Sequence, residues 1–137
     1  MPIHGEPASL DELLQRIGEC ENPVWRPRFR AAYWKDPNRT AKKLGITLVD
    51  AYSTIIKRLR KEDLREGPVE SDKEGDSRKK WIFRTRYSPP DPEKKRVLLY
   101  IKISSDANGV IWIESFHINE NKNWGDLPQP NSKRIPA

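Results

Sequence analysis

Apolar and polar residues alternate through the C-terminal half of the chain with the two-residue period of β-strands. Three segments follow this pattern, at 81–87, 97–104 and 110–117. The second and third are separated by Asp106-Ala107-Asn108-Gly109, a sequence typical of a hairpin turn. The pattern therefore predicts an antiparallel meander of three strands.

Helical spacing dominates the N-terminal half. Ser9 with Glu12 resembles a capping box, and the apolar stripe behind it predicts a helix that stops at Gly18. A short helix is predicted from Asn38 or Thr40 to Leu44-Gly45, and a longer one from Thr47 to 59, whereas the charged segment 60–80 indicates an exposed loop. Helices followed by strands predict an α+β fold, in which N-terminal helices pack on a small antiparallel β-sheet. We expect one domain over 1–137, with 1–8 and 119–137 irregular.

Composition narrows the class of protein. The chain has 137 residues, 26 basic and 20 acidic, which gives a formal net charge of +6 and favours polyanions or acidic proteins as partners. Cys20 is the single cysteine, which fits a reducing cytoplasm, and we expect no signal peptide and no membrane segment. A glycine-rich phosphate loop is lacking, and with only His4 and His117 as histidines we expect neither a metal nor another cofactor.

Alternation assigns polar residues to one face of the predicted sheet. Arg84 and Arg86 share a face of the first strand, and Tyr100 and Lys102 share a face of the second. If the strands pair, these four side chains line one surface. For the third strand, which ends at His117, the pattern does not decide which face is buried.

Such a surface suits RNA, because cations neutralise phosphates and aromatic rings stack on unpaired bases. It also supplies groups for cleavage without metal: His117 as acid or base, Lys102 and Arg84 as charge stabilisers, and Tyr100 as hydrogen-bond donor. We assign Arg86 and Lys80 to RNA binding. The alternative is a strand face that carries Lys, Arg and Tyr only for solubility.

Four segments occur in an order that resembles the MqsR family of bacterial toxins. They are KKLGITLVDAYSTIIKRLRKEDL at 42–64, the strand that begins at Trp81, YIKI at 100–103 and SFH at 115–117. The resemblance covers about 9–118. It implies a RelE-like fold, metal-independent cleavage of messenger RNA with or without the ribosome, and a cognate antitoxin as protein partner.

The resemblance also assigns roles to individual residues. Tyr100 matches the strand tyrosine that the family uses in cleavage, and His117 stands where the best-known member has a lysine. Glu66 replaces a second family lysine, so Arg65 is expected to serve instead. Ile82 stands in place of a glutamine and cannot form its hydrogen bonds.

Two further functions are compatible with the sequence. Segment 38–59 has the order of a helix-turn-helix, which would make the chain a DNA-binding regulator. However, the first turn of its second helix offers mostly apolar residues and Asp50, whose charge repels phosphate. The other alternative is a non-catalytic interaction protein, such as an inhibitor.

Overall fold

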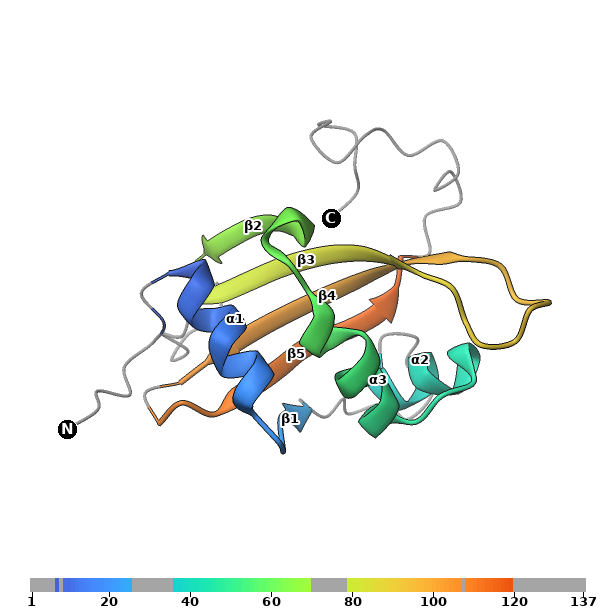
Figure 1. Cartoon of the computed structure of the whole chain (residues 1–137), viewed down its shortest axis with the longest axis horizontal. Coiled ribbons are helices and arrows are strands. Elements are labelled where there is room, and N and C mark those ends of the chain that lie inside the picture. The colour runs from blue at the N-terminus through green and yellow to red at the C-terminus, as the bar shows by residue number, and fades with distance from the viewer. Residues whose placement is uncertain (1–6, 8, 26–35, 70–78, 107, 120–137) are drawn as a thin grey trace.

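A computed structural model describes residues 7, 9–25, 36–69, 79–106 and 108–119. The fold is α+β, with three α-helices and a five-stranded mixed sheet (Figure 1). This confirms the predicted fold class in its coarse form. The segments 1–6 and 120–137, for which irregular structure was expected, lie outside the described residues, as does residue 8.

The helices begin where polar caps predict. Helix α1 spans Leu10–Glu19, and the Ser9 hydroxyl accepts a hydrogen bond from the Glu12 amide at 3.2 Å. Helix α2 spans Pro37–Leu44, slightly earlier than expected, because the Asp36 carboxylate caps it and proline suits its first turn. Gly45 ends α2 in the left-handed region, with a φ of 77°, which favours glycine.

The third helix is shorter than its apolar stripe predicts. Helix α3 covers Leu48–Thr54 and is followed by two 3-10 turns, η1 at Ile56–Arg58 and η2 at Lys61–Asp63. Leu59 nevertheless stays in the core, because the tighter turns keep the same side of the chain against the sheet. The stripe thus identified the buried side correctly but not the type of helix.

The strands run in the spatial order β1-β5-β4-β3-β2. Their bounds are β1 Val24–Trp25, β2 Leu64–Val69, β3 Lys80–Tyr87, β4 Val97–Ser105 and β5 Ile111–Ile118. The predicted meander is confirmed as β3-β4-β5. The prediction of an antiparallel sheet was wrong for one pair of strands, because the short β1 runs parallel to β5. A parallel neighbour is possible there since the chain between β1 and β5 crosses the whole sheet.

Strand β2 corrects the prediction of an exposed loop at 60–80 for its first half, while 70–78 lie outside the described residues. Gly67 and Pro68 suggested a loop, but β2 is an edge strand, where a residue without an amide proton is tolerated. Gly67 has a φ of 136°, and a Cβ there would lie 2.9 Å from the Lys80 carbonyl oxygen. The glycine therefore permits a close approach between β2 and β3.

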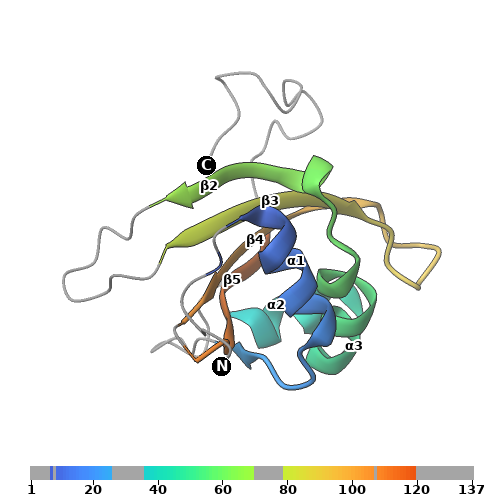
Figure 2. The same cartoon turned by 60° about the vertical axis from the view of Figure 1, so that its left-hand side comes forward.

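The helices cover one face of the sheet, as Figures 1 and 2 both show for α1 and α3. The core lies between the layers and includes Leu13 and Ile17 of α1 together with Phe83, Ile101 and Phe116 of the sheet. Within the described segments, no helix is long and apolar enough to span a membrane. The opposite face of the sheet carries the polar residues of β3, β4 and β5.

Candidate functional site

A β-bulge in β5 decides which residues face the polar side of the sheet. Lys102 pairs with Ser115 and Ile103 pairs with Ile113, so that Glu114 is an extra residue on β5. The alternation shifts by one position at Glu114. For this reason Ile111 and Ile113 are buried before the bulge, whereas Phe116 is buried after it. This explains why alternation alone did not decide which face of the third strand is buried.

Three of the predicted catalytic residues meet in one row across the sheet. Arg84 pairs directly with Tyr100, and Tyr100 pairs directly with His117. The rings of Tyr100 and His117 are stacked, with centroids 4.8 Å apart and planes 17° from parallel. On the other side, Cζ of Arg84 lies 5.7 Å from the centroid of the Tyr100 ring. We call Arg84, Tyr100 and His117 the stacked row.

The backbone fixes the orientation of the His117 ring. Nδ1 lies 3.2 Å from the carbonyl oxygen of Ile118. A carbonyl oxygen only accepts, so Nδ1 carries the proton and donates it in this contact. In the neutral imidazole Nε2 is then the nitrogen with the lone pair, which is the form that a general base requires.

Burial and neighbouring charges set the protonation of the other two members. Burial raises the pKa of Tyr100, partly opposed by the Arg84 charge, and Glu66 raises it further. Burial also lowers the pKa of Arg84, an effect that Tyr100 and Glu66 oppose and Arg65 reinforces. At neutral pH Tyr100 is thus a neutral phenol that donates hydrogen bonds, while Arg84 stays cationic because its ordinary pKa is so high.

The remaining predicted residues lie around the row. Lys102 is half-buried, two residues from Tyr100 on the same face, and pairs with Ile82 and Ser115. Arg86 is exposed opposite Leu98, towards the end of β3. These placements agree with the predicted cationic face.

Arg65 lies on the neighbouring edge strand β2. Its guanidinium donates to the carbonyl oxygens of Glu62 and Leu64, at 2.8 and 3.2 Å. It nevertheless remains close enough to Arg84 for its charge to lower the pKa of that guanidinium. Arg65 therefore adds positive potential beside the stacked row.

Lys80 is placed differently from its predicted role in a solvated, RNA-binding loop. It begins β3, is only 6% exposed, and its ammonium forms an ion pair with Glu114 at 2.9 Å. The Ser104 hydroxyl donates to the same Glu114 oxygen at 2.6 Å. Because the Lys80 ammonium is buried and paired with Glu114, it stabilises the fold and does not lie in a solvated loop. We call Lys80 and Glu114 the sealed pair.

Glu114 was not singled out from the sequence. Alternation gave it no defined face, and an isolated acidic residue in a strand usually faces water. Its carboxylate reaches Lys80 because Glu114 follows the buried Ile113 and therefore lies on the polar side of the sheet. Two features of the sequence could have identified Glu114. Alternation breaks down at that position, and a lysine stands at the start of the first strand of the meander.

The polar face is more buried than predicted. Arg84 is 7% exposed and His117 6%, while Tyr100 and Lys102 are half-buried. The face is thus a recessed one, at which the side chains pack against one another. Tyr100 is the most accessible member of the stacked row, and Lys102 beside it is half-buried as well.

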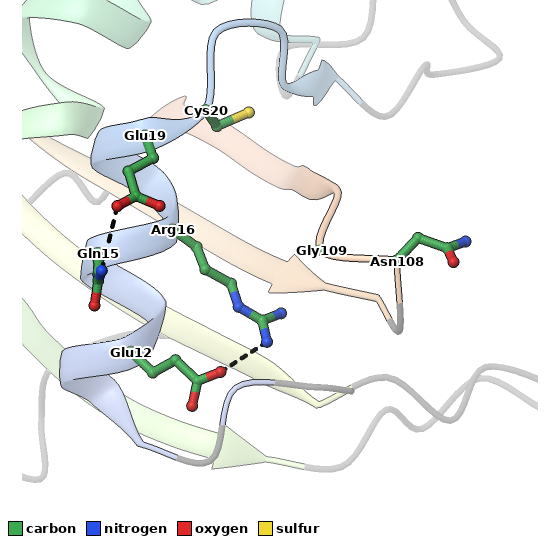
Figure 3. Close-up of a pocket in the computed structure, with 7 residues that line it drawn as sticks. All are labelled: Glu12, Gln15, Arg16, Glu19, Cys20, Asn108 and Gly109. Atoms are coloured by element: carbon green, nitrogen blue, oxygen red, sulfur yellow. Dashed lines mark hydrogen bonds and ion pairs between the residues drawn. The ribbon is translucent and has the colours of Figure 1, made fainter. Parts of the chain in front are cut away.

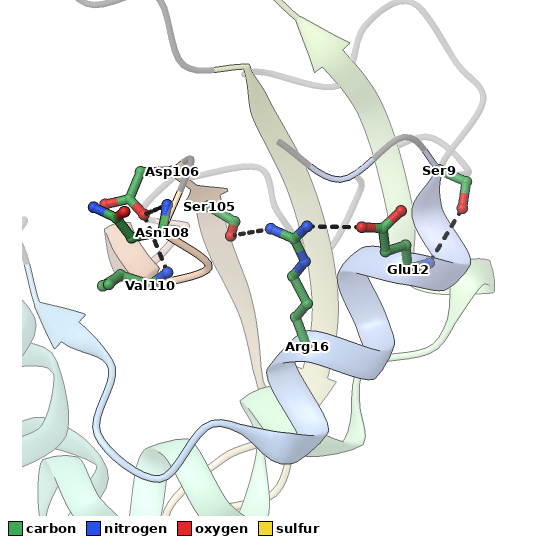
Figure 4. A network of polar contacts seen from close by, with 7 residues as sticks. All are labelled: Ser9, Glu12, Arg16, Ser105, Asp106, Asn108 and Val110. Carbon is green, nitrogen blue, oxygen red and sulfur yellow. Dashed lines mark hydrogen bonds and ion pairs between the residues drawn. The ribbon is translucent and has the colours of Figure 1, made fainter. Parts of the chain in front are cut away.

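A separate pocket of about 480 Å³ lies between α1 and the β4–β5 turn (Figure 3). It is lined by Glu12, Gln15, Arg16, Glu19, Cys20, Asn108 and Gly109. Figure 4 shows that Arg16 joins α1 to β4, donating to Glu12 at 2.7 Å and to Ser105 at 2.9 Å. These contacts stabilise the packing of α1, and the pocket contains none of the predicted site residues.

Comparison of the chain with models of known protein families, with characterised proteins and with solved structures found no match. Within the described segments, no group of three or more His, Cys, Asp or Glu side chains is arranged to hold a metal ion. The candidate site accordingly rests on the geometry and charge of the stacked row.

Proposed function

We propose that the chain is an endoribonuclease that cleaves messenger RNA without a metal ion, as the toxin of a toxin–antitoxin pair with a RelE-like, MqsR-related fold. The observation that carries the proposal is the stacked row. An imidazole, a phenol and a guanidinium from three adjacent strands lie in direct register. Together they supply a base, a hydrogen-bond donor and a positive charge, the groups that cleavage through the ribose 2′-hydroxyl needs.

Each member has a distinct role in the proposed step. Nε2 of His117 accepts the 2′-hydroxyl proton as the 2′ oxygen attacks phosphorus, and the bond from phosphorus to the 5′ oxygen breaks. The resulting imidazolium is the acid that protonates the leaving 5′ oxygen, so the proton balance closes. Arg84 stabilises the charge that develops on the phosphorane, while the neutral Tyr100 donates a hydrogen bond to it.

Lys102 and Arg86 hold the RNA beside the row in this proposal. Lys102 lies on the same face as Tyr100, and Arg86 continues the cationic side of β3 towards its end. The antitoxin and messenger RNA are the partners that the MqsR resemblance suggests, and the site of action is the cytoplasm. The net charge of +6 suits both an RNA substrate and an acidic antitoxin segment.

The helix-turn-helix alternative receives less support from the geometry of α2 and α3. Helix α3 has only seven residues, and its exposed side presents Val49, Asp50, Ser53 and Thr54. Val49 is 77% exposed, and Asp50 would repel phosphate. A recognition helix instead needs polar donors and cations at its exposed first turns.

The test is expression in a bacterium and cleavage of RNA by the purified protein. The parent should arrest growth and shorten transcripts, whereas His117→Ala and Tyr100→Phe should do so at least about 100-fold more slowly. Arg58→Gln, an exposed change outside the row, should behave as the parent. Equal toxicity of all four proteins would place the activity elsewhere. A harmless parent that binds duplex DNA would favour the regulator.

A further inference from the structure

We infer that the end of the molecule opposite the β4–β5 turn is a second RNA-binding surface, which holds the phosphate backbone of single-stranded RNA beyond the stacked row. We call it the basic end. It consists of exposed cations from α2 and from the loop between β3 and β4, namely Lys42, Lys43, Lys94, Lys95 and Arg96. The inference rests on the proposed function for the identity of its ligand.

A single contact brings these two segments together. The Lys94 ammonium donates to the carbonyl oxygen of Lys43 at 2.6 Å, across 51 positions of sequence. Lys43 lies in the last turn of α2, where a cation complements the helix dipole. In Figure 1 the loop extends past the sheet and turns back towards α2. The contact gathers the cations of both segments at one end.

The loop is built to hold its shape. Pro89 is buried, the Asp91 carboxylate accepts a hydrogen bond from the Glu93 amide at 2.9 Å, and the Asp91 carbonyl accepts one from the Lys94 amide at 3.0 Å. Such pre-organisation lowers the entropy that binding costs. Gathering like charges also costs stability, and phosphates would offset that cost.

The β3–β4 loop connects the basic end to the stacked row along β3, whereas α2 lies on the helix-covered side of the sheet (Figure 2). Arg84 and Arg86 share the polar face, and the strand ends at Tyr87, which pairs with Val97 directly after Arg96. Three residues of strand cover about 10 Å, so an RNA chain held at Arg84 reaches the loop within a few nucleotides. Cations along this path point to a polyanion of extended shape, and single-stranded RNA is that polyanion.

The probe is a 2′-O-methyl RNA, in which the attacking hydroxyl is blocked, so that binding is measured without cleavage. Oligonucleotides of about 6 and about 20 nucleotides are titrated into the full chain at several salt concentrations. Two double variants remove charge from the basic end, Lys42→Gln/Lys43→Gln and Lys95→Gln/Arg96→Gln. The matched control Arg58→Gln/Lys61→Gln removes the same charge from exposed positions elsewhere.

We expect each double variant at the basic end to weaken binding of the long probe on the order of tenfold, and to reduce the salt slope by about 0.7 for each phosphate that the variant no longer neutralises. Binding of the short probe should change little, and the control should match the parent. Lys94→Gln should weaken binding more than Lys95→Gln, because it also releases the loop from α2. Glu93→Gln, which removes an exposed carboxylate from the loop, should strengthen binding of the long probe.

Equal weakening in the control, or equal weakening for both probe lengths, would overturn the inference. If the variants at the basic end still bind RNA like the parent but no longer bind polyglutamate, the inference is also overturned, and an acidic protein is the favoured partner. If the parent cleaves no RNA but the variants still weaken binding as described, the nuclease proposal fails and the RNA-binding surface stands.

Discussion

The sealed pair and the stacked row lie on the same face of the same strands, yet different groups surround the buried cation in each. Lys80 is 6% exposed and Arg84 7%. Lys80 meets a carboxylate, so its charge is balanced within the fold. Arg84 lies against the face of an aromatic ring, which attracts a cation, and the carboxylate that raises its pKa, Glu66, is exposed on β2. The comparison separates a cation that holds the structure from one whose charge can act on an anion.

The largest expected effect is the loss of stability when the sealed pair is broken. Lys80→Met leaves the Glu114 carboxylate buried without its ammonium, which should lower the free energy of unfolding by about 3–5 kcal/mol. Urea denaturation followed by circular dichroism measures it. Lys79→Met, a change at the exposed neighbouring position, should stay within about 0.5 kcal/mol of the parent.

The double variant Lys80→Met/Glu114→Leu sharpens this prediction. It removes both charges together, so most of the lost stability should return. If the double variant is as unstable as Lys80→Met alone, packing rather than charge explains the effect. The sealed pair would then differ from the stacked row less than we propose.

The second effect is on catalysis rather than stability. Arg84→Met should slow RNA cleavage by about 100-fold, because it removes the charge that stabilises the transition state. Its unfolding midpoint should move less than that of Lys80→Met, since the carboxylate that acts on Arg84, Glu66, is exposed and stays hydrated when the guanidinium is removed. Rates with a short RNA and the unfolding curve of the same sample decide this. A variant that cleaves normally but unfolds easily would make Arg84 another structural cation.

A third, smaller effect appears at alkaline pH. Burial raises the pKa of Tyr52 and of Tyr100 above the value of the unfolded chain. In the window above pH 10 the unfolded chain therefore binds fewer protons than the folded one, and stability falls as the pH rises. Below that window the contribution is fully present. Thermal unfolding between about pH 8 and 11 should show the decline.

Burial also raises the pKa of Tyr87, and Tyr52 and Tyr100 should contribute to the decline unequally. Tyr52 is buried and donates to the Ile17 carbonyl at 2.8 Å, so Tyr52→Phe should remove most of the pH dependence. Tyr100→Phe should remove less, because Tyr100 is only half-buried and Arg84 opposes its shift. A larger effect of Tyr100→Phe would mean that the row is more deeply enclosed than its exposure indicates.

Periodicity predicted the parts of the fold that follow a single repeat. Ser9 marked the start of α1, and alternation assigned Arg84 and Tyr100 to one face, which their direct pairing confirms. Strand β2 escaped prediction because its Gly67-Pro68 step is typical of loops, and only its place at the edge makes it a strand. Local pattern carries no information about which neighbour a segment will find.

The candidate site was predictable to the same extent. Tyr100 and His117 were expected to converge, and their rings do stack. The ion pair of Lys80 was not expected, because its partner Glu114 lies at an irregularity that shifts the register of β5. The degree of burial also depends on how side chains from separate strands pack, which no periodicity describes.

The extra residue of β5 has a consequence for how this face could have arisen. Without it, the side chains after Ile113 would keep the phase of the preceding ones, and the imidazole of His117 would point towards the helices. Glu114 follows the buried Ile113 and faces Lys80 in either phase, so the half-period step changes only the later residues and carries the imidazole of His117 to Tyr100. The ion pair of Lys80 and Glu114 could therefore exist before the insertion, whereas the stacking of His117 on Tyr100 depends on that one extra residue.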